Sequence, residues 1–169
     1  MHRWLLLLCV AASCSSEMAS PPDDPCALKP VVAGGSAELG LGSSFAPVVA
    51  GQDVELQLGT QGLWMFIVNA RARDMNIGSG DQEGVINVAA LNESGQQVSL
   101  EIGCRVREFA ATSGGDLQLT SPYLLPLLPT STPGPAGLKV TIRLDIRDGE
   151  GRRAIDERAV VAHVPTQGP

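Results

Sequence analysis

Few residues of this 169-residue chain offer groups for catalysis. The two histidines are His2, near the start, and His163, near the end. A hydroxyl nucleophile normally needs a neighbouring base, and His163 is flanked by the apolar Ala162 and Val164. A lone histidine in such a place is more often structural than catalytic. We therefore predict that the protein is not an enzyme and that it carries no catalytic residue, no metal and no cofactor.

Acidic residues are more numerous, but their spacing matches no known site. Asp145, Asp148 and Glu150 lie close together without the full ligand series of a calcium loop, so they indicate a β-turn. Asp23 and Asp24 stand in a proline-rich stretch and indicate a solvated linker. The formal net charge is −6 and the pI is about 4.8. A chain of this charge has no basic surface for nucleic acid or anionic lipid.

The first residues have the organisation of an export signal. A short positive region precedes nine mostly apolar residues, Trp4 to Ala12, which is too few for a bilayer crossing of about 20 residues. The sequence Ala11-Ala12-Ser13-Cys14 resembles the bacterial lipobox, in which the cysteine is lipidated and becomes the mature N-terminus. Leucine is the commonest residue at the lipobox position that Ala11 occupies, so Ala11 departs from the pattern. The alternative is an ordinary signal peptide that is cut a few residues later.

The lipobox resemblance implies a signal peptide over residues 1–13, a lipid on Cys14 and a flexible tether over residues 14–25. It also implies a place in the bacterial cell envelope, with the membrane as a partner through the N-terminal lipid. Ser15, rather than aspartate, follows the cysteine, and this resembles lipoproteins that move on to the outer membrane. Whether the protein faces the periplasm or the cell surface stays open.

The remaining cysteines point to a disulfide. Of the four cysteines, Cys9 lies in the apolar leader and Cys14 carries the expected lipid, which leaves Cys26 and Cys104. Two such cysteines usually pair in an oxidising compartment. A bridge across 78 residues contributes about 4 kcal/mol in the chain-entropy model, as an upper figure. The alternative is two free, buried thiols.

The mature chain favours short strands, because 19 glycines and 12 prolines interrupt it. Its most apolar stretch, residues 59–71, predicts a central strand. Alternate residues of that stretch form two sets, Trp64, Phe66, Val68 and Ala70 on one side and Leu63, Met65, Ile67 and Asn69 on the other. Apolar residues in both sets predict that the strand is covered on both faces.

Further alternating segments predict the rest of the sheet structure. They are residues 53–58, 85–91, 98–109, 138–147 and 154–164. The last two predict a β-hairpin turned at residues 148–151. In residues 98–109 the alternation places Cys104 on the inward face. We predict an all-β, immunoglobulin-like β-sandwich of about seven to nine antiparallel strands over residues 26–165, with a tail at residues 166–169.

These features resemble known families only in part. The number of short strands, the expected disulfide and the Asp148-Gly149 turn resemble immunoglobulin-like and fibronectin-like sandwiches. The Gly59-Thr60-Gln61-Gly62 entry to an apolar strand is similar to uncharacterised secreted or lipoprotein domains of myxobacteria and related bacteria. That resemblance implies no activity.

Residues 122–137 form an apolar, proline-rich segment whose prolines exclude a regular central strand. Its large apolar side chains are candidates for partner contact if they are exposed: Tyr123, Leu124, Leu125, Leu127 and Leu128. The alternative, which we favour, is that the segment lies across an open edge of the sandwich and closes the core.

The sequence thus favours an envelope-anchored, non-catalytic binding module for a protein or a glycan. The expected contact loops are residues 59–62, 74–84 and 121–137. A first alternative is a periplasmic structural or assembly accessory. A second is an enzyme with a carboxylate site assembled from distant loops, for which the sequence offers no motif.

Overall fold

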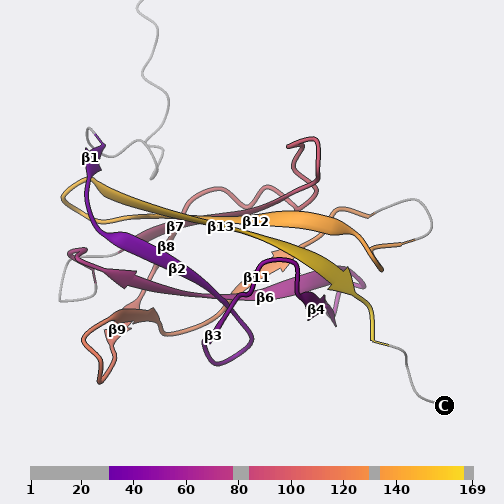
Figure 1. Cartoon of the computed structure of the whole chain (residues 1–169), viewed down its shortest axis with the longest axis horizontal. Helices are drawn as coiled ribbons and strands as arrows, with labels where there is room; N and C mark the ends of the chain where they lie inside the picture. The colour runs from indigo at the N-terminus through magenta and orange to yellow at the C-terminus, as the bar shows by residue number, and fades with distance from the viewer. Residues whose placement is uncertain (1–30, 78–83, 130–133, 166–169) are drawn as a thin grey trace, which may run out of the picture.

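The computed structural model describes residues 31–77, 84–129 and 134–165. Within these ranges the chain forms 13 strands and no helix, and the strands make two sheets packed face to face (Figure 1). The predicted all-β sandwich is therefore confirmed. Many strands are only two or three residues long, and two pairings are parallel, whereas the sequence predicted about seven to nine antiparallel strands.

Sheet A has six strands. In spatial order they are β1 (Val32–Ala33), β13 (Arg152–His163), β12 (Lys139–Arg147), β7 (Gly84–Leu91) and β8 (Arg105–Arg107), with β4 (Asp53–Glu55) also on the outer edge of β13. The predicted hairpin is β12 and β13, joined at Asp148–Gly151. Val140, Ile142, Leu144 and Ile146 face the core, as the alternation predicted.

Sheet B has seven strands. They are β3 (Ala46–Pro47), β2 (Ser36–Leu41), β6 (Trp64–Arg73), β10 (Leu117–Leu119) and β9 (Phe109–Ala111), with β5 (Gln57–Leu58) and β11 (Tyr123–Pro126) also paired to β6. Strand β6 is central, as predicted, because it has β2 and β5 on one side and β10 and β11 on the other. Phe66, Val68, Ala70 and Ala72 point into the core.

Several segments pass from one sheet to the other and close the sandwich edges. Residues 53–58 pair first with β13 and then with β6, and Leu56 between the two pairings is fully buried. Residues 32–41 do the same through β1 and β2. At this edge the Asp156 carboxylate of β13 accepts the Leu39 backbone N–H of β2 at 2.8 Å. The two sheets are therefore joined by polar contacts as well as by the core.

The opposite edge corrects one sequence-based expectation. Residues 98–109 are not one strand: residue 99 bridges Leu127, β8 pairs with β7, and β9 pairs with β10. The backbone turns at Gly103, which has a φ of 70°, a conformation that suits glycine. As a result Val106 is 41% exposed and Phe109 is buried. The alternation that placed Cys104 on the inward face also places Val106 there, and for Val106 that prediction was wrong.

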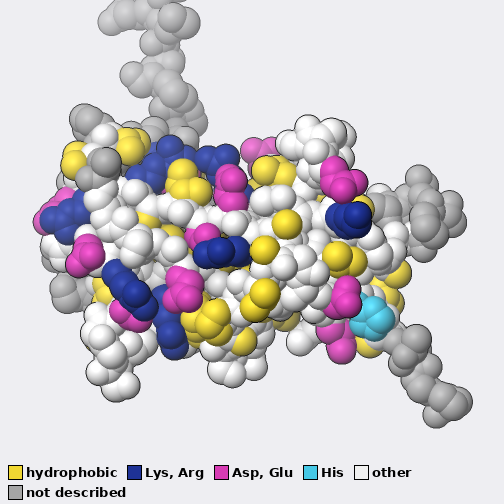
Figure 2. All heavy atoms as spheres, in the orientation of Figure 1, with side chains coloured by type: hydrophobic (Ala, Val, Ile, Leu, Met, Phe, Trp, Pro, Cys, Tyr) yellow, Lys and Arg dark blue, Asp and Glu magenta, His cyan; other side chains and the backbone are white. Residues whose placement is uncertain are grey.

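The outer face of sheet A is lined by ion pairs. Arg153 donates two hydrogen bonds from Nε to the Asp145 carboxylate, each of 3.0 Å, and a third from its terminal nitrogen. This bonding raises the pKa of the Arg153 guanidinium. Arg143 and Glu157 face each other on the same strand pair at 3.3 Å. Figure 2 shows acidic, basic and hydrophobic side chains intermixed on the side where β13 and β2 lie.

Candidate functional site

The two ends of the sandwich differ in chemistry. We call the end that holds β1 and the Asp148–Gly151 turn the proximal end, because the described chain begins there (Figure 1). We call the other end, where β6 and β12 begin, the distal end. At the proximal end the buried Asp148 carboxylate accepts the backbone N–H groups of Asn76, Glu150 and Arg152, each at 2.9 Å. These bonds tie the hairpin turn to the segment after β6.

The distal end carries an apolar pocket of about 240 Å³, which we call the distal pocket. It is lined by Gly62, Leu63, Trp64, Leu127, Leu128, Pro129, Gly134 and Pro135. Two of the three predicted contact loops therefore meet here, residues 59–62 and 121–137. The volume is below the roughly 300–1,000 Å³ of sites for whole small molecules. It suits a single side chain inserted by a partner.

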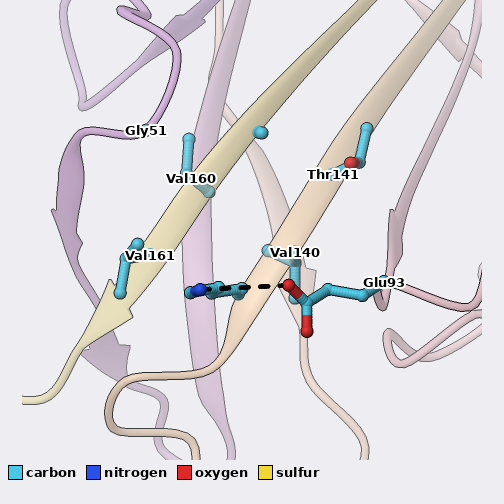
Figure 3. Close-up of a pocket in the computed structure, with 8 residues that line it drawn as sticks. Gly51, Glu93, Val140, Thr141, Val160 and Val161 are labelled. Carbon is cyan, nitrogen blue, oxygen red and sulfur yellow. Dashed lines mark ion pairs between the residues drawn. The ribbon is translucent and has the colours of Figure 1, made fainter.

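A second hollow lies at the same end, on the outer face of sheet A (Figure 3). This groove has a volume of about 320 Å³ and a floor of small residues from β12 and β13, with Gly51 on one side. Glu93, from the turn after β7, points across Val140 toward Lys139, and their charged groups are 3.9 Å apart. Both side chains are largely exposed, so this ion pair is weak and opens easily.

The turn after β7 borders a third, shallow hollow of about 520 Å³. The Asn92 side-chain oxygen accepts hydrogen bonds from the backbone N–H groups of Ser94 and Gln96 at 3.1 and 2.9 Å, and from the Ser94 hydroxyl at 2.7 Å. Asn92 thus fixes the turn that carries Glu93. The groove beside this turn was not predicted from the sequence.

The five predicted contact residues do not form one patch. Tyr123, Leu125 and Leu127 are buried, whereas Leu124 and Leu128 are 51% and 40% exposed. Strand β11 follows the usual alternation, so its odd-numbered residues enter the core and Leu124 faces outward. Only Leu127 and Leu128 line the distal pocket. The segment does form a short strand on β6, which its prolines had led us not to expect, and it closes the core as the favoured interpretation predicted.

Tyr123 is the largest fully buried side chain, and its hydroxyl has no hydrogen-bond partner among the described residues. The Arg107 guanidinium lies 5.6 Å from the centre of its ring. Burial raises the pKa of the Tyr123 phenol, an effect that Arg107 and Arg105 partly oppose. The residue therefore serves packing, with its polar atom left unsatisfied.

The third predicted loop lies elsewhere. The described part of residues 74–84 is at the proximal end, where Met75 and Ile77 are buried and Asp74 has a φ of 55°. Residues 78–83 fall outside the described ranges. His163, the last residue of β13, is exposed and offers its backbone oxygen to the Leu56 N–H at 2.7 Å.

The remaining predicted sites lie wholly or partly outside the described residues. Cys14 and Cys26 precede residue 31. Cys104 is half-buried and is not a free thiol, but its pairing with Cys26 stays a prediction. In the ranges that the structure describes, no group of three or more His, Cys, Asp or Glu side chains is arranged to hold a metal ion. The same ranges contain no helix long and apolar enough to cross a membrane.

Comparison of the chain with protein-family models, with curated proteins and with solved structures gave no match.

Proposed function

We propose that the protein is a lipid-anchored, non-catalytic binding module of the bacterial envelope, and that its distal end binds a protein partner. The observation that carries this proposal is the arrangement of the two ends. The described chain starts at the proximal end, and three hollows gather at the other. Strand β6 spans the distance between them with ten residues, or about 33 Å. A tether on Cys14 would then present the hollows away from the membrane.

The chemistry of the distal pocket favours a protein over a glycan. Its side chains are one tryptophan, three leucines and two prolines, and none of them is charged. Sugar hydroxyls need polar side chains around the aromatic ring, whereas a protein anchors best by burying an apolar side chain in such a pocket. Trp64 would form the wall against which that side chain packs.

Photocrosslinking in intact cells tests this role. A photoreactive phenylalanine analogue at position 128, on the rim of the distal pocket, is expected to capture one defined envelope protein. The matched control carries the analogue at position 113, in an exposed turn at the proximal end. A missing adduct at position 128, or the same adducts at both positions, would argue against a distal binding site. A periplasmic assembly factor as the captured protein would favour the accessory role instead.

Two further measurements test the anchor and the disulfide. Metabolic labelling with a radioactive fatty acid should mark the native protein, and Cys14→Ala should abolish the label. An ordinary cleaved leader would give no label in either. Non-reducing mass spectrometry of envelope-purified protein should recover the Cys26 and Cys104 peptides linked, and two alkylated free thiols would exclude the bridge.

A further inference from the structure

One edge of sheet A is open at strand β8. The register places Arg105 opposite Ile86 and Arg107 opposite Gly84 on β7, and no described strand pairs with the other side of β8. An unpaired edge presents backbone N–H and C=O groups and accepts another extended chain. Strand β8 therefore offers a docking edge that is three residues long.

The hydrogen bonds of β7 fix the direction of its backbone groups. The Ala90 C=O accepts the Val98 N–H at 2.8 Å, and the Ala90 N–H donates to the Ser99 hydroxyl at 3.1 Å. These groups of Ala90 therefore face away from β12, toward the side on which β8 lies. Because this direction alternates along a strand, the backbone groups of Ile86 and Gly84 face the same way.

The direction of the β8 backbone follows from this pattern. Arg105 and Arg107 lie opposite the two β7 residues whose groups point toward them, so their own N–H and C=O groups face β7. Val106, between them, has its N–H and C=O on the open edge. The Arg107 guanidinium turns back and donates to that C=O at 3.2 Å. The Val106 backbone is thus the part of the edge that an added strand would bond.

The same edge carries unpaired positive charge. In the ranges that the structure describes, neither Arg105 nor Arg107 forms an ion pair with a carboxylate. Alternate residues of a strand point to one side, so both guanidinium groups lie on the same face of β8. In a chain whose net charge is −6, two neighbouring cations without acidic partners favour an acidic occupant.

A cysteine next to this edge indicates which acidic segment that is. Cys104, the residue before β8, is not a free thiol, and the other three cysteines of the chain all precede residue 31. The predicted partner is Cys26, which follows directly on the acidic part of the tether, Asp23-Asp24-Pro25. A bridge between these cysteines would hold the acidic residues at a high local concentration beside β8.

We propose that residues 23–25 bind the open edge of β8 as an added antiparallel strand. The proposal rests on the predicted bridge, goes beyond the binding role above and uses a different surface. Its occupant is a segment of the chain itself, and no external partner is needed.

The proline of the segment fits this arrangement. The register that sets the two bridged cysteines opposite each other places Asp24 opposite Val106, where it supplies the N–H that the open edge needs. Pro25 falls at the next position, where the backbone nitrogen points away from β8 and no N–H is required. The added strand therefore loses no hydrogen bond to β8 through its proline.

The charges fit the same register. Asp23 falls opposite Arg107 and diagonal to Arg105. Residues placed in this way on antiparallel strands point to the same face and interact. A parallel strand from the same bridge would instead bring Lys29 to Arg107, and the two cations would repel. Charge therefore selects the antiparallel direction.

This strand determines where the tether leaves the domain. Arg107 lies opposite Gly84, the first residue of β7, so β8 ends at the proximal end and an antiparallel segment leads the preceding residues out there. Residues 15–22 then remain between the predicted lipid on Cys14 and the docked strand, with a reach of about 26–29 Å. The domain is thereby kept close to the membrane with its distal end directed away.

Amide hydrogen exchange, measured by NMR on the full mature protein, tests the added strand. The Val106 amide should exchange about tenfold more slowly with the bridge intact than after its reduction, because reduction lowers the local concentration of the segment. Asp23→Asn should speed the exchange about two- to fivefold, the effect of losing one exposed ion pair. The matched control is Asp24→Asn, which removes the same charge from a side chain on the other face and should leave the rate unchanged.

A charge exchange separates an ion pair from a general loss of structure. Arg107→Glu should speed the exchange of the Val106 amide, and Arg107→Glu combined with Asp23→Lys should slow it again. If Arg107→Glu unfolds the protein by removing the contact with Tyr123, Arg105→Glu replaces it.

Three outcomes would overturn the proposal. One is a Val106 amide that exchanges at the rate of an unpaired amide while the bridge is intact. Another is a slow amide that Asp23→Asn leaves unchanged, which would assign the edge to a different occupant. The third is a charge exchange that does not restore the slow rate. None of these results depends on the adducts at position 128, so the distal binding site is tested separately.

Discussion

The outward-pointing side chains of sheet A and sheet B differ in chemistry. On sheet A, two of the charged outward residues of β12 form ion pairs with β13, Arg143 with Glu157 and Asp145 with Arg153. On sheet B, the outward residues of the distal half of β6 are Met65 and Ile67. Sheet A also exposes two large apolar side chains on its outer face, Val106 at 41% and Ile155 at 42%, whereas Met65 and Ile67 are half-buried. The two outer faces therefore differ in their ion pairs and not in a simple division into polar and apolar.

The strongest test compares neighbours on β6. Phe66→Ala removes a fully buried ring and is expected to lower the free energy of unfolding by about 3–5 kcal/mol. Ile67→Ala removes a half-buried side chain on the outer face and should cost about 1 kcal/mol in dilute solution. Urea unfolding followed by the fluorescence of Trp64 measures both. Equal losses would mean that the outer face is as well packed as the core.

On sheet A the ion pairs should differ according to burial. Asp145→Asn leaves the Arg153 guanidinium without its carboxylate and should cost about 1–3 kcal/mol. Glu157→Gln, which removes an exposed partner of Arg143, should change stability by at most about 0.5 kcal/mol. Urea unfolding of both variants provides the comparison. A loss of stability for Glu157→Gln that exceeds the loss for Asp145→Asn would show that Glu157 makes stabilising contacts beyond its ion pair with Arg143.

A smaller effect is expected at Tyr123. Its buried hydroxyl has no partner among the described residues, so Tyr123→Phe should be neutral or stabilising by up to about 1 kcal/mol. Burial raises the pKa of the phenol in the folded state. The folded state therefore holds this proton more tightly, and the associated stability is present below the unfolded pKa of about 10 and is lost as the pH rises above it.

Ultraviolet titration can check this prediction directly, because Tyr123 is the only tyrosine in the chain. The phenolate absorbance of the folded protein should develop at a higher pH than that of the protein in urea. Coincident titrations would mean that the ring is exposed to solvent.

The smallest effect concerns the ion pair between Arg73 and Asp116 on the outer face of sheet B. The hydrogen bond that Arg73 donates to the Asp116 carboxylate lowers the pKa of Asp116. A carboxyl with a depressed folded pKa contributes stability above its unfolded value of about 3.9, and this contribution is lost as the pH falls through the folded pKa. NMR titration of the Asp116 carboxyl should show that depression, and Arg73→Gln should remove it. An unchanged pKa in the variant would assign the shift to another cause.

Much of the fold followed from local patterns. The β12–β13 hairpin, the central position of β6 and the strand β7 were predicted because alternation and turn residues are local signals. Residues 98–109 were predicted wrongly, since their partners change from one sheet to the other within a few residues. The periodicity of the sequence shows which residues are apolar, but it does not show which of the two sheets each residue joins.

The candidate site was predicted less completely. The segments around Gly62 and Leu128 were singled out, and the structure brings them together. The groove beside Lys139 was missed, because Glu93 and Lys139 are far apart in sequence and each looks like an ordinary surface charge. The apolar residues Met65 and Ile67 were noticed but assigned to a covered strand. The structure places both residues half-buried on the outer face of sheet B.

The pairing of β2 with β6 has a mechanical consequence. A pull applied at the first described residues reaches β1, which holds to β13 through only two paired residues, and then β2, which pairs with β6 over six. Because β2 runs lengthwise from the proximal end, the load acts along the strand, and its ladder bonds resist together in shear. The first segment to detach under tension would be β1. The pairing of β2 with β6 would still hold after β1 has detached.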